Sequence, residues 1–132
     1  MRLLPDVDLL VREIVTAAVS DVQVGTMIPP DLVDRMPFVM ARRVGGTAVH
    51  PRFADRALVD VQVWAADRKV AADTAEAVRV ALFRAWERQT VTAHGYIGAY
   101  SEIAAPTELR DETTPDGVYR FQATYALVVR PA

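Results

Sequence analysis

Two long stretches in which apolar and polar residues alternate constrain this chain more than any other feature. Within residues 57–65, every second position is apolar: Val59, Val61, Val63 and Ala65. Residues 118–129 repeat the pattern with a bulkier set: Tyr119, Phe121, Ala123, Tyr125, Leu127 and Val129. Because successive side chains of a strand point to opposite faces, each stretch predicts a strand with one buried face. Such a face must be covered by another layer of structure.

Two stretches with helical spacing can supply that layer. Pro5 and Asp6 favour a helix start, and the following stripe predicts a helix to about Ser20: Val7, Leu10, Val11, Ile14, Val15 and Ala18. Asp67 is a second good N-cap, and the alanine-rich stretch after it predicts a helix that ends near Arg88.

Shorter elements are predicted between these helices. Apolar and polar residues alternate over positions 22–24, which predicts a short strand. Residues 31–36 predict one helical turn. Residues 38–44 predict a strand that the Gly45-Gly46 pair ends, since paired glycines permit positive φ and a sharp turn. Residues 47–54 are predicted to be a loop.

The last third of the chain predicts a hairpin. Residues 96–103 form its first strand, which passes into a loop at Ala105 and Pro106. Residues 111–117 end in Pro-Asp-Gly, which favours chain reversal before the return strand. The whole order predicts an α+β fold: a mainly antiparallel sheet of about four to five strands, with two helices packed on one face. At 132 residues, we expect a single domain spanning 1–132.

Residues with catalytic or metal-binding potential are sparse. The chain has no Cys, which excludes disulfides, thiolate metal sites and cysteine nucleophiles. His50 and His94 lie in separate predicted loops, and two distant histidines are weak evidence for a metal site. Ser20 and Ser101 lack the surroundings of a nucleophile elbow. We therefore expect no enzymatic activity, no metal and no cofactor.

Charge and hydrophobicity bear on the partners. The net charge of −2 leaves no basic surplus to neutralise phosphates, so sequence-specific nucleic-acid binding is not expected. No apolar run approaches the ~18 residues of a membrane helix, so no membrane association is expected. Hydrophobic residues make up 52% of the chain. Either an oligomer interface buries some of these hydrophobic side chains, or alanine raises the hydrophobic percentage without creating an adhesive surface.

Six residues are candidates for a subunit or partner interface. Arg42 and Arg43 are adjacent, so on a strand one faces solvent or a partner and the other needs an acid or the rim of the core. Either a bridge between subunits or a plain surface salt bridge would satisfy them. Trp64 lies opposite the valine row, as a cover for the sheet or as an interface anchor.

The remaining candidates are acidic. Asp111, Glu112 and Asp116 cluster in the predicted hairpin turn, where a solvated turn is the plain alternative. The polar stretches 45–55 and 110–118 are the longest in the chain, and we expect one of them to dock onto an axial partner.

Four segments follow one another in an order that is informative as a whole. They are Leu3-Leu-Pro-Asp-Val-Asp-Leu-Leu-Val11, Phe38-Val-Met-Ala-Arg-Arg-Val-Gly-Gly46, Leu58-Val-Asp-Val-Gln-Val-Trp-Ala-Ala-Asp-Arg68 with its alanine-rich helix, and Tyr125-Ala-Leu-Val-Val-Arg-Pro131. In order and length they resemble the tail terminator and tail-completion proteins of actinobacterial siphophages. None of the segments is a catalytic signature.

The resemblance implies a structural virion protein without a cofactor. Tail terminators form a homohexameric ring on the head-proximal end of the tail tube, stop tube polymerisation and provide the surface that joins the head. The implied partners are further copies of the chain, the tail tube protein and a head-tail connector or neck protein, with DNA passing through the lumen. Assembly in the host cytoplasm is implied too.

Three alternatives stay open at this point. Other phage neck proteins, which complete the head or join it to the tail, have similar size and appearance. A small cellular α+β protein, either a ligand-binding module or an enzyme, would need a pocket with converging polar groups. A toxin-like or regulatory dimer is the third alternative.

Overall fold

Two helices, five strands and one 3-10 turn make up the part of the chain that the computed structural model describes, residues 2–110, 112 and 114–132. In chain order they are α1 (Val7–Ala18), β1 (Gln23–Gly25), η1 (Leu32–Arg35), β2 (Phe38–His50), β3 (Ala54–Ala65), α2 (Arg68–Glu87), β4 (Tyr96–Glu108) and β5 (Tyr119–Arg130). The predicted order of helices and strands is confirmed, including the short first strand and the helical turn after it.

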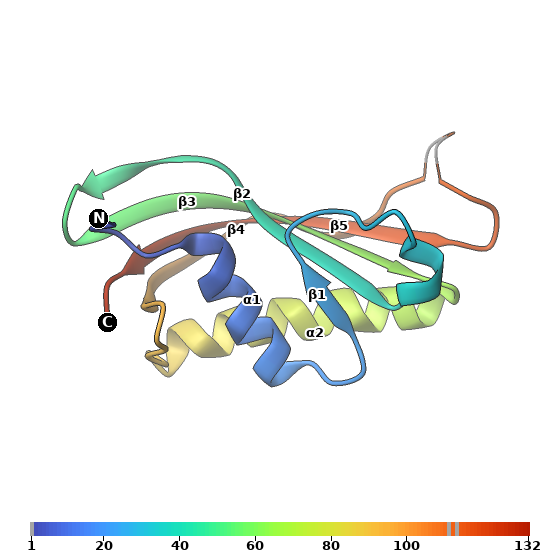
Figure 1. Ribbon diagram of the computed structural model, residues 1–132, viewed down its shortest axis with the longest axis horizontal. Coiled ribbons are helices and arrows are strands. Elements are labelled where there is room, and N and C mark those ends of the chain that lie inside the picture. Colours follow the sequence, from blue (N-terminus) through green and yellow to red (C-terminus); the bar gives the residue numbers. More distant parts are fainter. Residues whose placement is uncertain (1, 111, 113) are drawn as a thin grey trace.

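The strands form one sheet in the order β1-β2-β3-β5-β4. β1 pairs with β2 in parallel, whereas β2–β3, β3–β5 and β4–β5 are antiparallel. The two helices contact each other and cover the same face, α1 over β1 and β2 and α2 over β3, β4 and β5 (Figure 1). The predicted α+β fold, with a mainly antiparallel sheet and two helices on one face, is confirmed.

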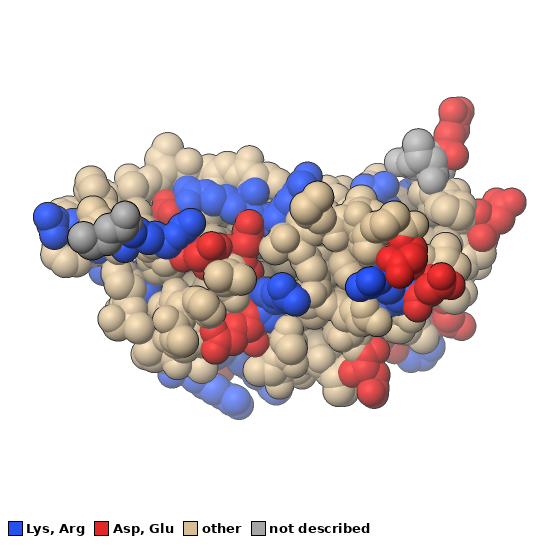
Figure 2. Space-filling model, viewed as in Figure 1, with Lys and Arg blue, Asp and Glu red and all other residues tan. Residues whose placement is uncertain are grey.

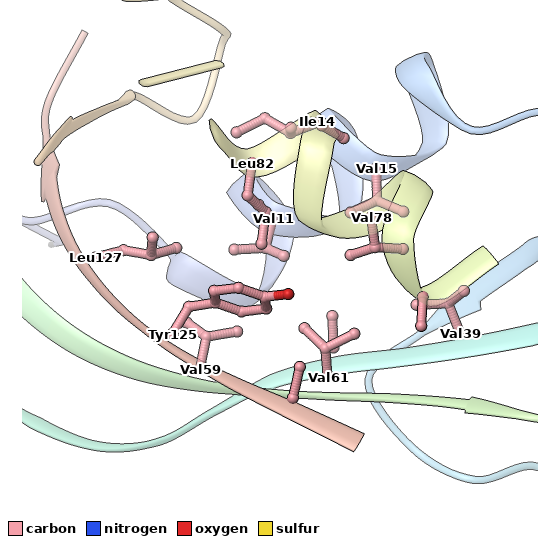
Figure 3. Packing of buried hydrophobic residues seen from close by; sticks show 14 of the residues in the cluster. Val11, Ile14, Val15, Val39, Val59, Val61, Val78, Leu82, Tyr125 and Leu127 are labelled. Atoms are coloured by element: carbon pink, nitrogen blue, oxygen red, sulfur yellow. The ribbon is translucent and has the colours of Figure 1, made fainter. Parts of the chain in front are cut away.

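The core lies between the helices and the sheet (Figure 3). Val11 and Val15 of α1 and Val78 and Leu82 of α2 are fully buried there. The valine face of β3 and the aromatic face of β5 meet them, as predicted, with Tyr125 the largest fully buried side chain. Because each buried aliphatic or aromatic side chain stabilises the fold by about 1.5–3 kcal/mol, this layer dominates stability.

Aspartate caps fix both helix starts, as predicted. An Oδ1 of Asp6 accepts a hydrogen bond from the backbone N–H of Leu9 at 3.3 Å. Asp67 accepts from the N–H groups of Lys69 and Val70 at 2.8 and 3.1 Å. Such caps satisfy donors that have no partner within the helix. No helix in the described part of the chain is long and apolar enough to cross a membrane.

The predicted end of the second strand at the Gly45-Gly46 pair, and the loop over residues 47–54, were wrong. β2 continues to His50, and β3 begins at Ala54. A register shift between Arg43 and Gly45 bends the strand instead. Gly46 has a φ of 106°, and an added Cβ would overlap the carbonyl oxygen of Arg56. The glycines therefore allow β2 to bend close to β3, giving a long hairpin arm, residues 44–58.

The predicted end of the fourth strand near Ile103 was also wrong. β4 extends to Glu108, with register shifts between Glu102 and Ala104 and between Ala104 and Thr107. Proline removes a backbone donor, but an edge strand has one side without a partner strand. Because β4 is the edge of the sheet, Pro106 does not interrupt it.

Candidate interaction surfaces

A row of hydrogen-bonded polar side chains runs across the sheet face opposite the helices. Asp60 accepts from Gln62 at 2.8 Å and from Gln122 at 3.0 Å. Arg120 donates from Nε to the side-chain oxygen of Gln62 at 2.8 Å. Asp60 and Gln62 are buried although no helix covers this face. Their hydrogen bonds offset the cost of that burial.

Arg42 lies on the outer face, directly opposite Asp60 in the β2–β3 pairing. Its side chain is exposed, and within residues 2–110, 112 and 114–132 no carboxylate lies within salt-bridge distance of it. This is the position expected for the solvent- or partner-facing member of two adjacent arginines. Its contact with a partner stays a prediction.

Arg43 points to the helix face and is satisfied within its own chain. Its two terminal nitrogens lie 2.5 and 2.9 Å from the carboxylate oxygens of Asp55, which is only 5% exposed. Its Nε donates to the carbonyl of Gly45 at 2.9 Å, and its backbone N–H donates to Asp8 at 2.7 Å. Arg43 thus ties the hairpin arm to α1 through contacts within its own chain, and a role of Arg43 between subunits stays a prediction.

Trp64 belongs to a second, smaller apolar cluster on the outer face. Its side chain is 4% exposed and packs with Phe38, Met40 and Val118, with a ring-centroid distance of 6.3 Å to Phe38. The guanidinium of Arg120 lies 5.5 Å from its ring. This burial fits the role of a cover for the sheet, and an interface role of Trp64 stays a prediction.

The predicted acidic turn connects β4 to β5. Asp111 lies outside the described residues, whereas Glu112 and Asp116 are exposed. Figure 2 shows acidic side chains at this end of the molecule, and basic side chains at the other end, where the hairpin arm turns. The turn therefore offers a charged surface, and its docking role stays a prediction.

Sequence reasoning missed two apolar surfaces. Val49 and Phe53 in the hairpin arm are 65% and 57% exposed, although residues 47–54 were predicted to be a polar loop. A groove of about 980 Å³ also runs between α1 and α2, floored mainly by small apolar residues: Ala17, Ala18, Ala77, Val80, Ala81 and Ala85. The available signals were two large apolar residues in a polar stretch, and the high alanine content of the apolar faces of both helices.

These features define a class of protein before any comparison. Among the described residues, no group of three or more His, Cys, Asp or Glu side chains could hold a metal ion. The buried polar groups of the outer face bond to one another instead of converging on a cavity. A sheet covered on one face, with exposed apolar and charged surfaces elsewhere, is typical of a small assembly protein.

Comparison with known families identifies the family of this chain. The family model described as phage tail termination protein matches residues 3–132, and the chain belongs to this family. A comparison with curated proteins gave no match. The resemblance to tail terminators is thereby confirmed, whereas the actinobacterial siphophage type stays a prediction. The family consists of structural proteins of the phage tail.

Proposed function

We propose that copies of this chain form a closed ring, expected to contain six subunits, on the head-proximal end of the tail tube. The ring stops tube polymerisation and supplies the surface that joins the head. The observation that carries this proposal is the family match over residues 3–132. The tail tube protein and a head-tail connector or neck protein are the axial partners, and no cofactor is needed.

The shape of the subunit supports such a role. A ring cap needs lateral surfaces for its neighbours and two axial surfaces, one for the tube and one for the neck. Head-to-tail contacts between different surfaces of identical subunits close into a ring when the rotation permits. The hairpin arm and the β4–β5 turn lie at opposite ends of the long axis (Figure 1), which gives the subunit distinct surfaces. In the proposed assembly, the ring forms in the host cytoplasm, enters the virion tail, and lets DNA pass through its lumen.

The deciding experiment is deletion of the gene from its phage, followed by electron microscopy of the lysate. Loss of a tube cap should give headless tails of uncontrolled, excessive length beside filled heads. Supplying the wild-type gene in trans should restore tails of normal length, which ties the defect to this chain.

A different outcome would assign the protein to the neck. Tails of normal length lying apart from complete heads would mean that the chain joins heads to tails without controlling tube length. The terminator role would then be wrong, although a role in the tail structure would remain. A cellular ligand-binding role would instead appear as a ligand-dependent rise in melting temperature.

A further inference from the structure

The hairpin arm carries an exposed apolar tip of fixed shape. Val49 and Phe53 are more than half exposed, and the rings of His50 and Phe53 stack with centroids 4.7 Å apart. Single exposed apolar residues are normal on protein surfaces, but an aromatic stack at the end of a projecting hairpin is a ready contact surface.

The arm is held rigidly at its base. The paired hydrogen bonds between Arg43 and Asp55 cross its two strands, and Asp8 binds the backbone of Arg43 from α1. The close approach of Gly46 to Arg56 fixes the bend further along. A rigid arm loses little conformational entropy on binding, which favours insertion into a preformed site.

The groove between α1 and α2 is a preformed site of suitable character. Its floor of alanines and Val80 leaves room for an aromatic side chain, and acidic residues on its rim include Glu13, Asp73 and Glu76. Arg84 and Arg88 line it as well. The carboxylate of Glu13 has no hydrogen-bond donor in the described part of the chain. The Nε2 atom of His94 lies 3.7 Å from its Oε2 atom.

The charge of the arm complements Glu13. Arg52 and Arg56 are exposed and form no salt bridge within the described ranges, and the arm's single acid, Asp55, is buried against Arg43. The groove runs along the outer side of the helix layer, from the C-terminal half of α1 to the C-terminal end of α2, whereas the arm turns in the sheet layer (Figure 1). Pairing of Asp55 with Val129 of β5 holds the arm in the sheet, so it cannot fold over the helices into its own groove, and a second copy is the natural occupant.

We infer that the hairpin arm of one subunit inserts into the α1–α2 groove of the next subunit. Phe53 lies on the alanine floor, and Arg52 pairs with Glu13. The contact joins two different surfaces of identical chains, so it is heterologous and can propagate around a ring. The inference rests on the proposed ring and names the surfaces that build it.

Thiol cross-linking tests the contact directly, because the wild-type chain has no Cys and only the introduced thiols of this chain can react. Phage would carry Phe53→Cys and Ala77→Cys in the same chain, and purified tails would be treated with a short bismaleimide. Covalent multimers that end at the ring size, expected to be six, support the inference. The pair Val33→Cys and Ala77→Cys is the matched control. Val33 is 60% exposed but lies in η1, outside the arm, and should give no multimers.

Normal-length tails that contain the Phe53→Cys, Ala77→Cys subunit but give no multimers would overturn the inference and leave the proposed function intact. If this variant fails to make normal tails, exchanging the charges of Arg52 and Glu13 tests the inference instead. Arg52→Glu and Glu13→Arg should each cause loss of normal-length tails, and the two together should restore them. Failure of the exchange to restore tails, with the melting temperature of each variant unchanged, would overturn the inference. Normal-length tails without the gene would instead overturn the proposed function.

Discussion

At the scale of single residues, Arg42 and Arg43 have different roles because adjacent side chains of a strand point to opposite faces. Arg42 is exposed on the outer face, whereas Arg43 is bound by Asp55 and by the carbonyl of Gly45. The first residue is available to a partner, and the second stabilises the subunit.

Replacement of each arginine by glutamate should separate these tasks. Arg43→Glu places a second acid beside buried Asp55, and we expect the free energy of unfolding to fall by about 2 kcal/mol or more. Arg42→Glu should leave the melting temperature nearly unchanged and reduce ring formation. Thermal unfolding and negative-stain microscopy of both variants provide the check. Equal losses of stability would assign Arg42 to the fold instead.

Tyr125 offers a second test at this scale. Its hydroxyl is buried and has no hydrogen-bond partner among the described residues, and burial raises the pKa of Tyr125 well above its ordinary value. We expect Tyr125→Phe to keep or raise the melting temperature, because it removes an unpaired polar group.

The pH dependence of Tyr125 follows from the same burial. Above pH about 10, the unfolded chain releases the phenolic proton while the folded chain retains it, so stability falls as pH rises. Tyr125→Phe should weaken this decline, measured as the free energy of unfolding against pH. A clear loss of stability at neutral pH would show that the hydroxyl has a partner, such as a buried water.

At the scale of elements, the hairpin arm depends on one glycine more than on its neighbour. Gly46 needs its positive φ and has no room for a Cβ, whereas a Cβ on Gly45 would meet Leu58 at an ordinary 3.5 Å. Gly46→Ala should therefore lower the free energy of unfolding by about 2 kcal/mol or more. Gly45→Ala is the matched control and should stay within about 0.5 kcal/mol of wild type in the same denaturant titration. Similar losses for both would show that the bend itself is dispensable.

The β4–β5 turn is the other element with a separable role. Shortening residues 111–117 to a two-residue turn should leave folding intact, because the core clusters draw no side chain from the described residues of this segment, 112 and 114–117. We expect the shortened phage to make tails that fail to join heads, scored by microscopy and plaque count. Joined particles in normal numbers would show that the turn is not the dock. Glu112→Lys with Asp116→Lys keeps the length and tests the charge alone.

At the scale of the whole molecule, the subunit is asymmetric in two directions. One sheet face is covered by helices and the other is not, and the basic arm end lies opposite the acidic turn end (Figure 2). Asymmetry of this kind suits the proposed ring subunit, which would present different surfaces to the tube, the neck and its neighbours.

The position of the protein in the virion should reflect this asymmetry. Antibodies against the chain should label one end of the tail, and on headless tails they should mark the end that would meet the head. Immunogold microscopy of wild-type phage and of tails from a head-deficient mutant makes the comparison. Label along the tube would contradict a cap.

Much of the fold could be predicted because its signals are local. The alternation over residues 57–65 identified a strand face, and Asp6 and Asp67 marked helix starts by their own capping chemistry. The Gly45-Gly46 pair misled the prediction, because the same glycine freedom that ends a strand also lets it bend. Pro106 misled it as well, since only the position of β4 at the sheet edge makes a proline acceptable there.

The interaction surfaces were only partly predictable, because they depend on what lies across the fold. The sequence by itself determined the α+β class, the buried faces and the opposite orientations of Arg42 and Arg43, since periodicity and side-chain direction are local properties. Only the tertiary structure decided that Asp55 forms a salt bridge with Arg43 and that a second apolar cluster buries Trp64. It also decided that α1 and α2 line a groove together. These outcomes depend on contacts between residues distant in sequence, which no local pattern records.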